Sequence, residues 1–100
     1  MVIQYKYKLG THRNNRRLWL EGNRLSSHGF VKDKRYNLRY ATNCIMIEFD
    51  EFGTHKINGT DKRPIIDICN TQVGQNIKTD NVMVAFDVDN LLIEGIENDT

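Results

Sequence analysis

The strongest constraint on the fold is a pattern that occurs twice along the chain. Residues 9–15 read LGTHRNN and residues 52–58 read FGTHKIN, so Gly-Thr-His recurs with a basic residue after it. The two copies also end alike, in IMIE at 45–48 and LLIE at 91–94. Such self-similarity in a fixed order predicts a duplicated structural unit.

The segment between these landmarks is repeated as well. Asn23 and Phe30 are as far apart as Asn70 and Ile77, and an aspartate follows three residues later in both copies. Asparagine is a favoured helix N-cap, so a helix of one to two turns is predicted to begin at Asn23 and at Asn70. Gly29 and Asn76 are the candidates for left-handed residues at the ends of these helices.

Alternation of apolar and polar residues predicts strands elsewhere in each copy. Gly-Thr-His at 10–12 is expected to break the first strand, and residues 41–43 and 50–53 are expected to form turns. The predicted strands are 3–9, 17–21, 35–40, 45–49, 65–68, 82–86 and 91–93.

One unit of strand, short helix and hairpin is too small to bury its own apolar face. We therefore expect a mainly β fold of about six to eight short strands, in which two such repeats pair about a pseudo-twofold axis as a barrel or sandwich. A chain of 100 residues supports one domain, with repeat one at about 1–49 and repeat two at about 50–95.

The formal net charge of +1 hides a strong division along the chain. Residues 1–47 carry ten Lys and Arg against two acids, whereas residues 48–100 carry four against eleven. This asymmetry fits a polyanionic partner for the first half, or head-to-tail self-association between halves. It also fits two charged faces that neutralise each other within one fold.

Basic residues with interspersed asparagine and tryptophan form the candidate site. Arg and Asn are side chains that grip phosphates and read base edges, and an exposed Trp offers a surface on which a base can stack. Arg35 and Arg39 lie four apart on a predicted strand, and therefore on one face. The candidate nucleic-acid-binding residues are Arg13, Asn15, Arg16, Arg17, Trp19, Arg24, Lys32, Lys34, Arg35 and Arg39.

Other chemistry has little support in the sequence. His12 and His55 match between the copies, but nothing at ligand spacing accompanies them, so turn roles are favoured over a metal site or a catalytic pair. The acid pairs at 50–51 and 87–89 fall at predicted hairpin breaks, where Asp shapes turns. Cys44 and Cys69 are expected to be buried free thiols. We expect no metal, no cofactor and no catalytic residue, and an enzyme is disfavoured.

No apolar run approaches the roughly 20 residues of a membrane helix, and the N-terminal segment carries charges where a secretory signal is apolar. The sequence therefore predicts a soluble cytoplasmic protein that does not associate with membranes.

Residues 18–48 resemble the swapped-hairpin module of the AbrB/MazE superfamily, most closely its SymE-like branch. The residues that carry the resemblance are Leu20, Gly22, Leu25, Gly29, Phe30, Tyr36, Leu38 and Tyr40. Asp33 stands where the family usually has Gly and Arg16 where it has Pro, and the second copy lacks both glycine motifs. In AbrB-type proteins two chains each supply one module, so two modules in one chain imply a single-chain pseudo-dimer.

The resemblance implies DNA binding in the AbrB and MazE branches and RNA-directed toxicity in the SymE branch. Our expectation is a small nucleic-acid-binding protein that acts through its basic first repeat, with DNA favoured and a regulatory role. The alternatives are a SymE-like RNA-targeting toxin or nuclease, for which His12, Arg13 and Arg16 are the residues to suspect, and a protein-interaction module. Such a module would act through the acidic second half, on a protein partner or on another copy of the chain.

Overall fold

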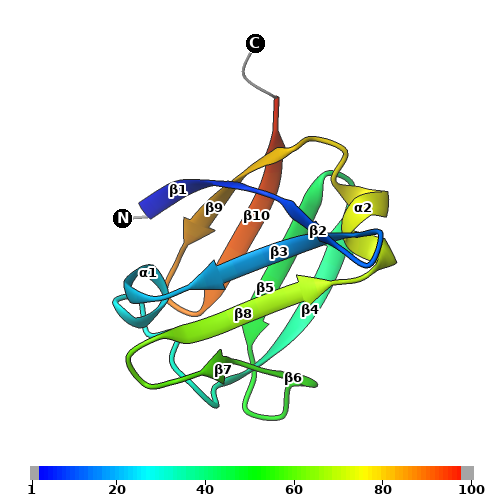
Figure 1. The fold of residues 1–100 in the computed structure, drawn as a ribbon. Helices are drawn as coiled ribbons and strands as arrows, with labels where there is room; N and C mark the ends of the chain where they lie inside the picture. The colour runs from blue at the N-terminus through cyan, green and yellow to red at the C-terminus, as the bar shows by residue number, and fades with distance from the viewer. Residues whose placement is uncertain (1–2, 98–100) are drawn as a thin grey trace.

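A computed structural model describes residues 3–97 as a mainly β fold with two short helices, as the alternation predicts (Figure 1). The strands and helices in chain order are β1 (Ile3–Lys8), β2 (Gly10–His12), β3 (Asn15–Glu21), α1 (Asn23–Ser26), β4 (Arg35–Ala41), β5 (Cys44–Phe49), β6 (His55–Lys56), β7 (Asn58–Gly59), β8 (Pro64–Cys69), α2 (Thr71–Asn76), β9 (Asn81–Phe86) and β10 (Asn90–Ile96).

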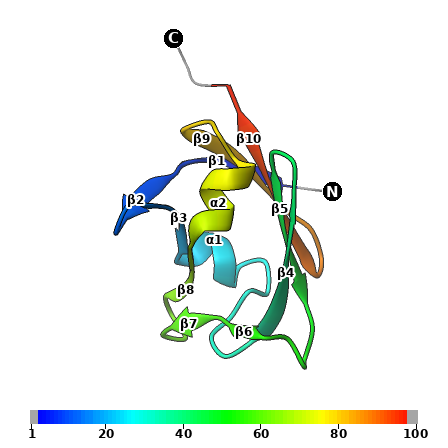
Figure 2. The ribbon, with the colours of Figure 1, turned by 90° about the vertical axis from the view of Figure 1, so that its right-hand side faces the viewer.

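The strands form two antiparallel sheets that face each other. One sheet has six strands in the order β1-β9-β10-β5-β4-β6, and the other has four in the order β2-β3-β8-β7. Seen on edge, the two sheets are separate layers (Figure 2). Helix α2 contacts β3 of one sheet and β4 and β5 of the other, and the two helices lie at opposite ends of the four-stranded sheet (Figure 1).

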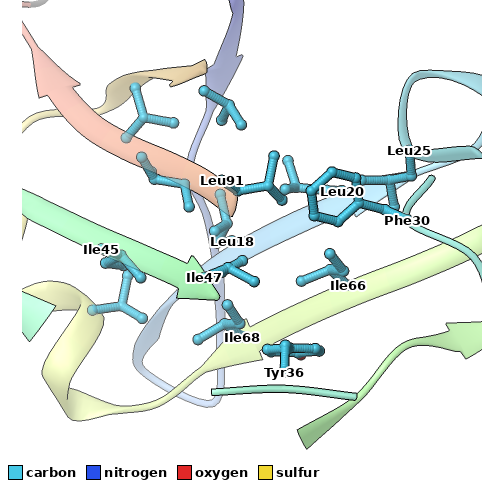
Figure 3. Packing of buried hydrophobic residues seen from close by; sticks show 14 of the residues in the cluster. Leu18, Leu20, Leu25, Phe30, Tyr36, Ile45, Ile47, Ile66, Ile68 and Leu91 are labelled. Carbon is cyan, nitrogen blue, oxygen red and sulfur yellow. The ribbon is translucent and has the colours of Figure 1, made fainter. Parts of the chain in front are cut away.

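Strand alternation fills the space between the sheets with apolar side chains. Leu18 and Leu20 of β3 point inward while Trp19 between them is 39% exposed, which confirms the predicted orientation of the tryptophan. Ile66 and Ile68 of β8 pack beside them, and β5 and β10 contribute from the opposite sheet (Figure 3). The buried hydrophobic residues are Leu9, Leu18, Leu20, Leu25, Phe30, Tyr36, Ile45, Ile47, Ile57, Ile66, Ile68, Val73, Ile77, Val82, Val84, Phe86, Leu91 and Ile93.

The helix termini follow the sequence signals only in part. Asn70 is the N-cap of α2, where its side-chain oxygen accepts a hydrogen bond from the Val73 N–H at 3.2 Å. Helix α1 begins at Asn23 as predicted, but Asn23 is not its N-cap: the N-cap is Gly22, whose φ of 87° few other residues adopt. Gly29 is left-handed as expected, whereas Asn76 is the last residue of α2 and does not have a positive φ.

The described residues have more strands than expected, because Gly-Thr-His at 10–12 forms β2 instead of a break and the two-residue strands β6 and β7 were not predicted. The reversal comes at Arg13 and Asn14, and the chain bends between β1 and β2 at buried Leu9. The two Gly-Thr-His copies are not structurally equivalent: His12 lies on β2 in the four-stranded sheet, and His55 lies on β6 in the six-stranded sheet.

Candidate nucleic-acid interface

The β2–β3 hairpin ends in a two-residue turn made by Arg13 and Asn14. Both have positive φ, 52° and 68°, as the tightest hairpin turns require of their central residues. Asn tolerates this conformation, but in Arg the side chain crowds the following carbonyl and costs about 1–2 kcal/mol. Arg13 is exposed at the tip, and no hydrogen bond or ion pair of its side chain is recorded with residues 3–97.

A polar hollow of about 200 Å³ lies beside this turn, between the start of β3 and helix α2. It contains two cations, several amide side chains and no acid. We call it the polar hollow, and its lining residues are Asn14, Asn15, Arg16, Asn70, Thr71, Gly74, Gln75 and Lys78.

Arg16 and Lys78 are held in place at the edges of the polar hollow. Nη2 of Arg16 donates to the Thr79 carbonyl at 2.7 Å and to the Asp80 carboxylate at 3.0 Å. Its side chain also lies against α2, since a Cβ on Gly74 would be 3.2 Å from the Arg16 Cγ. Nζ of Lys78 donates to the Gly74 carbonyl at 2.9 Å, one helical turn back. Both cations are therefore pre-positioned.

Arg17 has partners within the fold that the sequence did not predict. Its Nε and Nη2 donate to both oxygens of Asp67 at 2.9 Å, and the guanidinium lies 4.4 Å from the centre of the Trp19 ring. The Asp67 hydrogen bond raises the pKa of Arg17 above its ordinary value. One face of the Trp19 ring is thus covered, so a stacked base would have the other face.

The remaining predicted cations are spread over other parts of the surface. The Arg24 guanidinium lies over Tyr5 of β1 at 4.1 Å from the ring centre, while Lys34 lies 3.8 Å from the Phe49 ring and Arg35 donates to the Gly53 carbonyl. Arg39 pairs with Glu48 on its own hairpin. Lys32 is exposed in the loop before β4.

Ion pairs between the two halves neutralise only a small part of the charge division. Ion pairs join Arg16 to Asp80 and Arg17 to Asp67, and two further pairs, Lys56–Asp33 and Arg63–Glu21, run in the opposite sense between the halves. The ten predicted residues also have partners on different elements, so they are not all gathered at one place. Of the ten, Arg13, Asn15 and Arg16 are the ones gathered at the polar hollow.

Sequence reasoning missed Asn70, Gln75 and Lys78 as neighbours of the basic turn. They belong to the acidic half of the chain. Strand β8 pairs with β3, with Cys69 opposite Arg17, and α2 follows directly after β8. This pairing brings α2 and its neighbours to Asn15 and Arg16. Strand register between distant segments has no local sequence signal, so this part of the hollow could not be read from composition or spacing.

The histidines and acids do not form a metal site among residues 3–97, where no suitable group of His, Cys, Asp or Glu occurs. Asp50 and Asp87 have the turn roles expected for them: their carboxylates accept hydrogen bonds from the N–H groups of Phe52 and Val88. Cys44 and Cys69 are free, as expected, but partly exposed rather than buried. Partial burial, with a smaller effect of Glu94, raises the pKa of the Cys44 thiol and so lowers its reactivity.

The helices within residues 3–97 are too short and too polar for any of them to cross a bilayer. Comparison of the chain with protein-family models, with curated proteins and with solved structures gives no match.

Proposed function

We propose that this protein binds nucleic acid at the polar hollow and the adjoining Arg13 turn. The observation that carries the proposal is the composition of the hollow, which joins Arg16 and Lys78 with amide side chains and has no acid among its lining residues, with Asp80 paired to Arg16 at its edge. Cations position phosphates, and Asn and Gln amides offer the donor–acceptor pair that matches a base edge. DNA is the favoured partner, and the favoured role of the protein is regulatory.

The conformation of Arg13 supports this assignment. A type I′ hairpin turn favours Asn or Gly at this position, and Arg is strained there. Residues kept in unfavourable conformations concentrate at functional sites. A cation held at an exposed hairpin tip, beside the polar hollow, is well placed to meet a phosphate.

We also propose that the chain is a single-chain pseudo-dimer of two strand–helix–hairpin repeats. The strand orders support it. If β1 is exchanged with β6, β2 with β7, and so on to β5 with β10, the strand order of each sheet becomes its own reverse, as a twofold axis requires. Helices α1 and α2 exchange in the same way, because each follows a strand of the four-stranded sheet and precedes a hairpin of the other.

The registers support the same axis. Leu20 lies opposite Ile66 in the four-stranded sheet, and Met46 lies opposite Leu92 in the six-stranded sheet, and each pair is 46 residues apart. The hydrogen bonds Gly95 N–H to Asn43 O and Phe49 N–H to Asp89 O are related by the same shift. An axis through both central strand pairs is the arrangement that two swapped-hairpin modules would make.

The test is fluorescence anisotropy with labelled duplex DNA and labelled single-stranded RNA over a salt series. Arg13→Gly removes the cation and the strain together, so we expect weaker binding and a fold more stable by about 1 kcal/mol. If Arg13 contacts a phosphate of duplex DNA, the log–log salt slope falls by about 0.9. Lys78→Gln should weaken binding in the same direction.

Lys62→Gly is the matched control, because Lys62 is an exposed cation in the β7–β8 turn and lacks a positive φ. It makes the same change of charge away from the hollow and should leave binding almost unchanged. Equal loss of affinity in Arg13→Gly and Lys62→Gly would mean that only net charge matters. Absence of binding at low salt would overturn the proposal.

A further inference from the structure

A second hollow lies beside the six-stranded sheet, away from the polar hollow. Its volume is about 580 Å³, and it is lined by the α1–β4 loop, the β5–β6 loop and the β9–β10 turn. Phe49, at the end of β5, supplies its aromatic wall, and its carboxylates include Glu51 and Asp89. We call it the acidic hollow.

The two most exposed large hydrophobic residues among 3–97 lie on the loops that border this hollow. Phe52 is 84% exposed on the β5–β6 loop, and Val88 is 79% exposed on the β9–β10 turn. Each exposed apolar side chain lies next in sequence to an acid that lines the hollow, Glu51 and Asp89. Exposed apolar surface bordered by polar residues is typical of interaction sites.

Both loops are ordered by hydrogen bonds of their backbone N–H groups, which hold the backbone at Phe52 and Val88. In the β5–β6 loop, Gly53 N–H donates to the Asp50 carbonyl at 2.8 Å, and Phe52 N–H donates to the Asp50 carboxylate at 2.9 Å. A Cβ on Gly53 would lie 2.5 Å from the Tyr36 carbonyl oxygen, so the loop packs tightly on β4.

The β9–β10 turn is ordered in the same way. Val88 N–H donates to the Asp87 carboxylate at 2.8 Å, and Phe49 N–H donates to the Asp89 carbonyl at 3.0 Å. Pre-ordered loops reduce the entropy lost when a partner binds.

The charge around these loops is negative and favours a positively charged partner. Residues 50–54 and 87–89 contain four acids and no cation. The lining of the hollow has four acids against two cations, Lys34 and Arg35, so its net charge is negative. Glu51 and Asp89 have no side-chain ion pair recorded with any described residue. An anionic ligand is disfavoured here, and a cationic one is complementary.

We propose that the acidic hollow and its two apolar tips are a docking surface for a basic protein segment that carries apolar side chains. Lysine or arginine side chains of the segment would meet Glu51 and Asp89, and its apolar side chains would pack on Phe52 and Val88. This surface is separate from the polar hollow, so the protein would hold nucleic acid and a basic protein partner at the same time.

The test uses the full chain and a short fluorescein-labelled peptide of alternating lysine and leucine residues. Peptides of the same length that alternate lysine with serine, or glutamate with leucine, separate the contributions of charge and apolar contact. We expect the lysine–leucine peptide to bind about tenfold or more tightly than either, and Phe52→Ser or Glu51→Lys to remove that advantage. Amide chemical shifts should move at residues 49–54 and 87–90.

Ile3→Ser and Asp61→Lys are the controls, since Ile3 is 41% exposed on β1 and Asp61 is exposed in the β7–β8 turn. Both should bind the peptide like the parent, and circular dichroism should show that all four variants are folded. The proposal is overturned if the controls weaken binding as much as Phe52→Ser, or if no peptide binds. DNA affinity of Phe52→Ser, measured beside it, should be unchanged, which separates this site from the polar hollow.

Discussion

Tyr36 is a buried phenol whose ionisation should report on the core. Burial first, and the negative charges of Asp67 and Tyr40 next, raise its pKa from 10.0 to about 12. Above pH 10 the unfolded chain releases this proton while the folded protein keeps it, so the free energy of unfolding must fall as pH rises from 10 to 12. Between pH 9 and pH 11 the loss from this residue is about 1 kcal/mol.

Urea denaturation of the parent and of Tyr36→Phe at these two pH values measures the effect. Other groups also titrate in this range. The quantity to compare is therefore the fall in the free energy of unfolding between the two pH values, in the parent and in Tyr36→Phe. The parent should lose more stability than Tyr36→Phe. Equal losses would mean that Tyr36 ionises at its ordinary pKa.

The orientation of individual side chains could be predicted where it depends on the local alternation of apolar and polar residues. Leu18, Trp19 and Leu20 point as the pattern predicts. Arg16 and Arg17 were predicted to grip phosphate, but their hydrogen bonds to Asp80 and Asp67, 64 and 50 residues away in sequence, were not predicted. Those distances explain why, because no short window contains both partners.

The β5–β6 loop depends on one glycine. A Cβ on Gly53 would lie 2.5–2.7 Å from backbone atoms of Tyr36, which cannot move without disturbing β4. Gly53→Ala should therefore cost about 1–3 kcal/mol of folding stability. Thermal denaturation measures this loss.

Gly10→Ala is the matched substitution, since its Cβ would meet only the Arg17 carbonyl oxygen at 4.0 Å. It should change stability little. If the two variants have the same melting temperature, Gly53 is not closely packed on β4.

At the scale of elements, hairpins were easier to predict than edge strands. The β4–β5 and β9–β10 hairpins have long alternating strands and were expected. Strand β2 was missed because Gly-Thr-His is typical of a turn, and β6 and β7 were missed because two-residue strands have no periodicity. Such short strands exist only through pairing with a neighbour.

The whole molecule depends on contacts between its halves. Strand β3 pairs with β8 and β5 pairs with β10, so each sheet is completed by strands from both halves. Fragments 1–50 and 51–100 should each fail to show cooperative unfolding alone, and an equimolar mixture should recover the β-sheet circular dichroism of the intact chain. Their opposite charges favour the mixed pair, and recovery should weaken with salt. Native-like cooperative unfolding of either fragment alone would contradict this.

The pairing of β3 with β8 also has a consequence for protein synthesis. Arg17 pairs with Gly10 of β2 early, but the other edge of its strand stays unpaired until Cys69 has left the ribosome. At elongation rates of about 5–20 residues per second, the nascent first half spends several seconds with Leu18 and Leu20 uncovered. Pairing between residues so far apart is slow as well. We therefore expect the nascent first half to be a substrate for chaperones, and folding to finish only after β10 has been made.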